Sequence, residues 1–357
     1  MKKIRRFLLI FLKWLLLAVV AVEVCCFLII TVSNYLLFGQ AFEGSRVHYD
    51  PFTLFLNDQG PRPTAHNPAV PGGSNHRTIW MFGGSALRGD PTMRGDSASV
   101  DATIPSYLAG LLNCPGSPQP CTVLNFAENS YNSLMETKYL QKLLIESPKA
   151  PDLIIFYDGA NDCAYFAQHR TPYGHYGYRR LQAAVENYRK SFFGLLKPLN
   201  AAVYSSFTKE FYDKLMQVAV PLEPGDPALK SMVDMTARRY DHVRKLAGCY
   251  GARFLLVWQP IHWVETGEVA PQVREQERRL GIQGERFLAI RQNFSVVYRA
   301  LEQKLQEQPF FINFQNVLCP RKTLVYAPDG VHLKAAGNEM VARELARVLE
   351  DIWLKER

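Results

Sequence analysis

The sequence predicts an α/β protein, with a three-layer α/β/α sandwich around a mostly parallel five-stranded sheet and one transmembrane helix before it. Two observations carry this prediction, a long apolar run at the N-terminus and a series of short apolar runs separated by helical stretches. Short runs that are apolar throughout are typical of strands buried on both faces of a parallel sheet. There are five of them: Thr78–Phe82, Thr122–Phe126, Leu153–Tyr157, Arg253–Trp258 and Phe310–Phe314.

The N-terminal segment has the charge pattern of a membrane anchor. Four basic residues open the chain: Lys2, Lys3, Arg5 and Arg6. The apolar run that follows, Phe7–Ile30, contains only two charges, Lys13 and Glu23. At 1.5 Å per residue the run makes roughly 36 Å of helix, enough to cross a bilayer. Because the next basic residue is Arg46, the positive-inside rule places the N-terminus in the cytosol and the rest in the periplasm or another extracytoplasmic space.

Two alternatives to a single-pass anchor remain open, and the sequence disfavours both. A cleaved signal peptide has a shorter apolar run that a small-x-small pattern closes, and such a pattern is weak here. A lipid-modified Cys25 would need a small residue before it, and Val24 stands there. Glu23 has no explanation at the level of sequence, since a carboxylate deep in lipid is costly.

We expect one folded domain behind the anchor. Residues 1–33 form the basic tip and the transmembrane helix, and residues 34–77, rich in Pro, Gly, Asn and His, form a stalk or a loop wrapped on the domain. Residues 78–357 form the domain itself, with a helical insertion at about 164–250 and a variable stretch at 261–283. Helical patterning is expected at Arg180–Leu196, Phe207–Val218, Pro227–Leu246 and Ala335–Leu354.

The charge distribution argues against a nucleic-acid-binding function. The anchor segment supplies half of the formal net charge of +8. The pairs Arg179/Arg180, Arg238/Arg239 and Arg278/Arg279 are scattered without interleaved aromatics, so we interpret them as solvated helix faces and expect no nucleic-acid partner.

The cysteines are consistent with export. Cys114 and Cys121 bracket a turn-rich loop that a disulfide can close in an oxidising compartment. A bond between Cys163 and Cys319 is a further hypothesis. No C-x-x-C pair predicts a zinc site.

Polar groups follow the first, second, third and fifth apolar runs. They are Gly83-Gly84-Ser85-Ala86, Ala127-Glu128-Asn129-Ser130-Tyr131-Asn132-Ser133, Asp158-Gly159-Ala160-Asn161-Asp162 and Asp329-Gly330-Val331-His332. Because parallel sheets bind ligands at the carboxyl ends of their strands, we expect these groups to meet at one edge.

The residue types predict nucleophilic catalysis. A serine hydroxyl becomes a nucleophile when a base takes its proton, and His332 is suited to that role for Ser85. Asp329, three residues earlier, can bond the imidazole and fix its tautomer. Asn161 can donate to an oxyanion, together with backbone N–H groups of Ser85 and of the loop after the second run.

These four blocks, in this order, resemble the SGNH (GDSL-like) hydrolase superfamily from about Thr78 onward. The most specific matches are Gly159-Ala160-Asn161-Asp162 and Asp329-Gly330-Val331-His332. The resemblance implies the flavodoxin-like SGNH fold and a Ser85–His332–Asp329 triad. It also implies an oxyanion hole of Ser85, Ser130 and Asn161, with no metal or other cofactor. Candidates for lining the cleft are Gly84, Gly159 and Gln259, and for Gln259 a capping role is an equal alternative.

Two positions depart from the family pattern. The usual Gly-Asp-Ser reads Gly83-Gly84-Ser85, which keeps the nucleophile. The second-block glycine that offers its N–H to the oxyanion is replaced by Ser130, whose Cβ restricts the backbone and puts that donor in doubt.

The resulting functional hypothesis is a membrane-anchored serine esterase that acts outside the cytosol. Its expected substrates are O-acyl groups on cell-envelope glycans or lipids. An O-acyltransferase with the same triad is the first alternative, and an inactive membrane scaffold that keeps the fold is the second.

Overall fold

The computed structural model describes residues 2–38, 48–56, 60–69, 76–89, 100–114, 120–179, 181–182, 185, 203, 206–216, 221–282 and 288–354. The chain forms two compact units. The first combines Met1–Gly44 with Gly177–Val220, and the second combines Ser45–Tyr176 with Pro221–Arg357.

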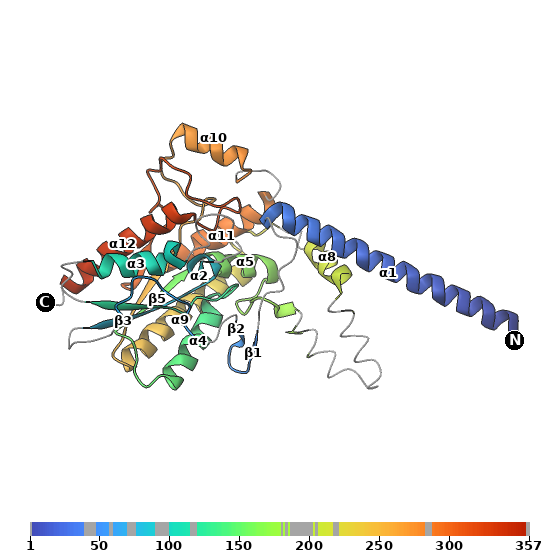
Figure 1. Cartoon of the computed structure of the whole chain (residues 1–357), viewed down its shortest axis with the longest axis horizontal. Coiled ribbons are helices and arrows are strands. Elements are labelled where there is room, and N and C mark those ends of the chain that lie inside the picture. Colours follow the sequence, from blue (N-terminus) through green and yellow to red (C-terminus); the bar gives the residue numbers. More distant parts are fainter. Residues whose placement is uncertain are drawn as a thin grey trace. The chain divides into compact units, whose positions relative to one another are not determined.

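The second unit is built around a five-stranded sheet (Figure 1). Its strands are β3 (Arg77–Gly83), β4 (Cys121–Asn125), β5 (Leu153–Asp158), β6 (Arg253–Trp258) and β7 (Phe311–Asn313). They pair in parallel throughout, in the order β4-β3-β5-β6-β7. Each strand coincides with one of the five apolar runs, and the order is the doubly wound one of flavodoxin-like folds. The predicted fold class is confirmed.

The strands are apolar throughout because both faces of the sheet are covered. In β5, Leu153, Ile155 and Tyr157 belong to one hydrophobic core. The alternating residues Ile154 and Phe156 belong to the other. Successive side chains of a strand point to opposite faces, so a sheet between two cores needs apolar residues at every position.

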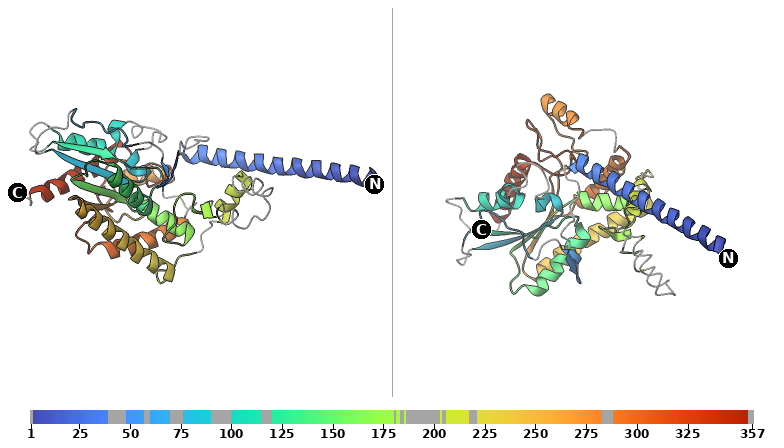
Figure 2. Two further views of the ribbon diagram at one scale, coloured as in Figure 1. Left: turned by 90° about the horizontal axis from the view of Figure 1, so that it is seen from below. Right: turned by 45° about the vertical axis from the view of Figure 1, so that its right-hand side comes forward.

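Helices form the two outer layers. One core contains residues of α3 (Ile104–Leu112) and α12 (Ala335–Leu354). The other contains residues of α4 (Ser133–Glu146), α5 (Ala160–His169), α9 (Pro227–Cys249) and α11 (Leu288–Leu305). Figure 2 shows α9 and α11 together on one side of the sheet and α3 on the other. The final helix has the predicted bounds, and α9 extends the predicted helix by three residues.

Four elements were not expected from the sequence. Residues 34–77 contain a short antiparallel hairpin of β1 (His48–Asp50) and β2 (Leu54–Leu56). Its Phe55 and Leu56 are buried in the core, and the Tyr131 hydroxyl donates a 2.5 Å hydrogen bond to the Phe55 carbonyl. The variable stretch 261–283 contains α10 (Pro271–Arg279), and α11 follows it.

The first unit contains α1 (Lys2–Phe38) and α8 (Phe207–Met216). The segment Lys3–Val32 of α1 is the one described helix that is long and apolar enough to cross a membrane. The Glu23 carboxylate accepts hydrogen bonds from the backbone N–H groups of Phe207 (2.5 Å) and Thr208 (3.1 Å) and from the Thr208 hydroxyl (2.7 Å). Glu23 therefore caps the N-terminus of α8, which accounts for a charge that the sequence leaves unexplained. Most of the helix predicted at 180–196 lies outside the described residues.

The predicted disulfides do not form. Cys121 is fully buried among the core residues at the start of β4, whereas Cys114 is exposed. Cys163 is likewise fully buried, and it is not bonded to Cys319. The Cys121 and Cys163 thiols instead pack into the hydrophobic cores as small apolar groups.

Candidate active site

The loops that follow β3, β4 and β5 meet because these strands are neighbours. Ser85 opens α2 (Ser85–Arg88) one residue after β3, with Gly84 between them. The loop that contains Ser130 follows β4, and Gly159 alone separates β5 from α5, which carries Asn161. Parallel strands end at the same edge of the sheet, so the chain gathers these groups as the sequence predicts.

Ser85, His332 and Asp329 are joined in one chain of hydrogen bonds. The Ser85 Oγ lies 2.8 Å from His332 Nε2, and His332 Nδ1 lies 2.5 Å from Asp329 Oδ2. The other Asp329 oxygen accepts hydrogen bonds from the backbone N–H groups of Val331 (2.9 Å) and His332 (3.0 Å). The carboxylate is therefore held in place from two sides.

The charge of Asp329 determines which nitrogen of His332 can act as a base. Burial alone would raise the pKa of Asp329, but His332 and the backbone donors lower this pKa below its ordinary value. An ionised carboxylate only accepts, so Nδ1 must donate to it, which leaves the lone pair of Nε2 facing the Ser85 hydroxyl. This is the tautomer that proton abstraction from a serine requires.

The loop that carries Asp329 and His332 is fixed by backbone contacts at its base. Ala327 N–H donates to the His332 carbonyl (2.9 Å), and Tyr326 forms a β-bridge with Leu333. Gly330 has φ +71°, a left-handed conformation that favours glycine.

A buried charged network lies against this loop, and sequence reasoning did not find it. Arg321 pairs with Glu265 and, at 2.9 Å, with Glu277, and the Tyr326 hydroxyl donates to Glu265 (2.6 Å). Glu277 Oε2 also lies 3.2 Å from His262 Nε2. The backbone N–H of His262 donates to the Gly330 carbonyl (3.0 Å). The network joins α10 to the triad loop. The carboxylates lie more than 40 residues before Arg321 and show no shared spacing.

The candidate oxyanion donors surround Gly84. A Cβ added to Gly84 would lie less than 3.0 Å from Asn161 Nδ2, so glycine is needed for this close approach. Asn161 Nδ2 donates to the Tyr131 carbonyl (2.6 Å). An amide nitrogen has two hydrogens, so one remains for another acceptor.

Ser130 takes the backbone conformation that a glycine would take at its position. Its φ is +64°, in the left-handed region that side chains with a Cβ rarely adopt. No described residue accepts a hydrogen bond from its N–H group. Ser130 stands where the family pattern has glycine, and its Cβ does not prevent the left-handed backbone expected there.

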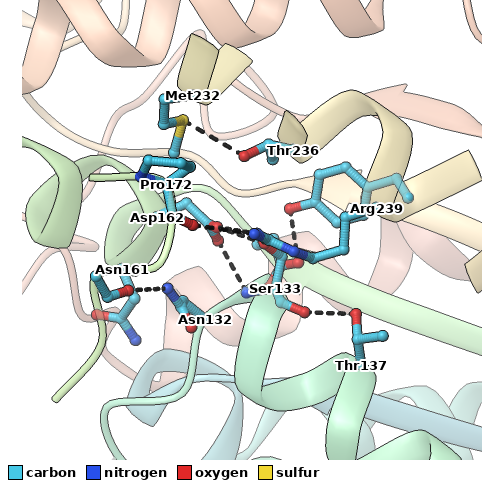
Figure 3. A network of polar contacts seen from close by, with 12 residues as sticks. Asn132, Ser133, Thr137, Asn161, Asp162, Pro172, Met232, Thr236 and Arg239 are labelled. Carbon is cyan, nitrogen blue, oxygen red and sulfur yellow. Dashed lines mark hydrogen bonds and ion pairs between the residues drawn. The ribbon is translucent and has the colours of Figure 1, made fainter. Parts of the chain in front are cut away.

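A second buried network joins the loop after β4 to the start of α5 (Figure 3). Asp162, next to Asn161, accepts hydrogen bonds from the Ser133 hydroxyl (2.5 Å) and the Ser133 N–H (3.1 Å). Arg239 of α9 donates to Ser133 Oγ (2.7 Å) and to the Pro172 carbonyl (3.0 Å). Asp162 and Ser133 thus tie the start of α5 to the start of α4.

Arg239 corrects one sequence interpretation. Of the Arg238/Arg239 pair, Arg238 is exposed as expected, but the Arg239 side chain is only 10% exposed because it faces Asp162. Successive residues of a helix point about 100° apart, so the two neighbours face different surroundings, which adjacency in sequence cannot reveal.

Two further carboxyl groups form a buried pair beside this network. The Glu136 carboxyl group lies against that of Asp158, and no described donor reaches either Glu136 oxygen. The Tyr240 hydroxyl donates to Asp158 (2.8 Å). Burial and the charge of Asp162 raise the pKa of Asp158 to about 7, and burial raises the pKa of Glu136 well above its ordinary range. The pair therefore shares a proton at neutral pH.

Gly159 and Gln259 lie side by side behind Asn161. Gly159 has φ +136°, and a Cβ there would touch the Gln259 side chain at 3.4 Å. Gln259 is 4% exposed, and its backbone N–H donates to the Asp158 carbonyl (2.8 Å). Its role as a cleft residue stays a prediction.

Comparisons with known proteins give only distant similarities. No family model and no curated protein matches the chain. Among solved structures, a putative arylesterase from Agrobacterium tumefaciens is 18% identical, with a TM-score of 0.39 over 77% of this chain and 99% of that one. An esterase from Pseudoalteromonas is 12% identical, with a TM-score of 0.40 over 78% and 99%. An acetylxylan esterase from Geobacillus stearothermophilus is 14% identical, with a TM-score of 0.37 over 76% and 93%.

The Glu136–Asp158 pair predicts how stability depends on pH. The folded pair keeps a proton that the unfolded chain releases above its ordinary carboxyl pKa of 3.8. The pair's contribution to the unfolding free energy is therefore largest at low pH. It falls as the pH rises from about 4 through about 7, where Asp158 ionises, and continues to fall while Glu136 keeps its proton. Asp158→Asn replaces the shared proton with an amide donor, so this fall should become smaller.

The measurement is denaturant unfolding of the full-length chain in non-ionic detergent at several pH values. Asp241→Asn is the matched control, because Asp241 is a partly exposed carboxylate of α9 that pairs with Lys245. It should not flatten the profile. An Asp158→Asn profile as steep as that of the wild type would show that the pair holds no proton.

Proposed function

We propose that this chain is an SGNH-type serine esterase with Ser85 as nucleophile, His332 as base and Asp329 as the orienting carboxylate. The observation that supports the proposal is the continuous hydrogen-bonded chain Ser85–His332–Asp329, with bonds of 2.8 and 2.5 Å. A nucleophile hydrogen-bonded to a base that a third group orients is the arrangement acyl transfer requires.

The reaction follows from these positions. Ser85 Oγ attacks the acyl carbonyl carbon, and its proton passes to His332 Nε2. The tetrahedral oxyanion accepts hydrogen bonds from the N–H groups of Ser85 and Ser130 and from Asn161 Nδ2. His332 returns the proton to the departing alcohol, and a water molecule, activated by the same nitrogen, releases the acid from Ser85.

The setting that fits this enzyme is the outer face of a membrane. In the proposal, α1 is a single-pass anchor with its four basic residues in the cytosol, and the esterase domain lies in the periplasm or another extracytoplasmic space. Substrates are O-acyl groups of cell-envelope glycans or lipids.

Hydrolysis of acetyl esters tests the assignment of the triad. Ser85→Ala should abolish measurable turnover, and Asp329→Asn should lower kcat roughly 10⁴-fold, because His332 loses the carboxylate that fixes its tautomer. Ser231→Ala, an exposed serine of α9, should behave as the wild type. Turnover that survives in folded Ser85→Ala would refute the proposal. Acetyl groups that appear on an added oligosaccharide instead of in free acetate would favour the acyltransferase.

Gly84→Ala tests the oxyanion donor separately from the triad. The added methyl group displaces the Asn161 amide, and the loss of one oxyanion donor costs about 3 kcal/mol, or roughly 100-fold in kcat. Gly248→Ala is the matched control, because a Cβ there meets no atom within 4 Å. An unchanged kcat in Gly84→Ala would exclude Asn161 as a donor.

A further inference from the structure

A cavity of about 780 Å³ lies beside the triad loop and contains none of the triad residues. Its lining includes one face of α11 together with His262 and Trp263, which follow β6. Nothing in the reaction described above uses this space.

Two lining residues connect the cavity to the site. The backbone N–H of His262 donates to the Gly330 carbonyl. A Cβ added to Gly330 would lie 2.7 Å from Trp263 Nε1. Gly330 directly follows Asp329. A ligand held against Trp263 therefore lies next to the loop that positions His332.

The cavity is positively charged. Among the described residues that line it, Arg291 and Arg299 are cationic and none is Asp or Glu. Burial lowers the pKa of His262, which keeps this imidazole neutral and leaves the two guanidinium groups as the source of charge.

Neither guanidinium has a carboxylate partner in the described part of the chain. Arg291 donates to the Ile282 carbonyl (2.5 Å) and lies 5.0 Å from the centre of the Trp263 ring, and its buried Nε has no acceptor. Arg299 is exposed at the edge of the cavity. The buried Arg291 Nε lacks an acceptor, so an anion that reaches this guanidinium would be stabilised by it, with the exposed Arg299 adding a second positive charge.

The polar groups of the lining form a row. Gln292, Ser295, Arg299 and Gln303 recur at helical spacing along one face of α11. The eleven residue steps from Gln292 to Gln303 extend over roughly 16 Å of helix. Amide and hydroxyl groups spaced over this length, with an aromatic ring at hand, suit an extended ligand with many hydroxyl groups better than a compact ion.

We infer that the cavity binds an acidic oligosaccharide, with Arg291 and Arg299 pairing with its carboxylates and the glutamine side chains with its hydroxyls. The bound sugar chain would present its ester to Ser85. This last step rests on the proposed function, whereas binding itself does not.

The test is calorimetric titration of the full-length chain in non-ionic detergent with a galacturonic acid hexamer. Wild type and Ser85→Ala should bind the hexamer equally and more weakly as salt rises. Arg299→Gln should weaken binding at least tenfold. The double variant Arg291→Gln/Arg299→Gln should weaken it further. Arg238→Gln, an exposed arginine of α9, is the matched control and should bind as the wild type. A neutral glucose hexamer should bind at least tenfold more weakly.

The outcomes separate this inference from the esterase assignment. The inference would be overturned, whatever the esterase activity, by any of three results. The acidic hexamer fails to bind, the arginine variants bind it as tightly as the wild type does, or the neutral hexamer binds as tightly as the acidic one. If the protein binds only phosphatidylglycerol vesicles, and both arginine variants lose that binding, the sugar inference is overturned in favour of a lipid headgroup. If the hexamer binds through the two arginines but the protein has no esterase activity, the sugar site is supported. Only its link to Ser85 is then refuted.

Discussion

The parallel pairing of β3 with β4 on one side and with β5 on the other puts the ends of three strands at one edge of the sheet. Three groups of the candidate site, Ser85, Ser130 and Asn161, depend on this pairing. Ser85, Ser130 and Asn161 each follow one of these strands, and Gly84 permits the close approach of Asn161. The triad loop joins them from the C-terminal side, where α12 packs against α3.

The site is held in place by buried charges on both sides. Arg321 pairs with Glu265 and Glu277 beside the loop that carries Asp329 and His332. Arg239 lies near Asp162, between the loop after β4 and the start of α5. Buried ion pairs add little net stability, but removing one partner typically costs about 3–5 kcal/mol because the other charge remains uncompensated. In the proposed enzyme their value lies in geometry, since oxyanion donors act only when they are already oriented.

The periodic parts of the fold could be predicted from the sequence, and the parts that depend on distant partners could not. Strands buried on both faces have a local signature, so all five were found, and the bounds of α12 follow from its amphipathic pattern. Ser85, Asn161, Asp329 and His332 were placed together because strand ends converge.

Arg239, Arg321 and the Glu136–Asp158 pair were missed because each acquires its role from residues far along the chain. The expected Cys114–Cys121 disulfide was wrong for the same reason, since spacing carries no information about which thiol the core buries. Glu23 has meaning only with Phe207 and Thr208. Ser130 shows that the fold can also override a local preference. It takes a left-handed backbone that its residue type alone disfavours.

Labelling with a fluorophosphonate, followed by peptide mass spectrometry, tests most directly whether Ser85 is an activated nucleophile. We expect one adduct per full-length chain, on Ser85, which is absent from Ser85→Ala and forms much more slowly in His332→Gln. A wild-type protein that keeps its unfolding transition but forms no adduct, or forms it on another residue, would contradict the account.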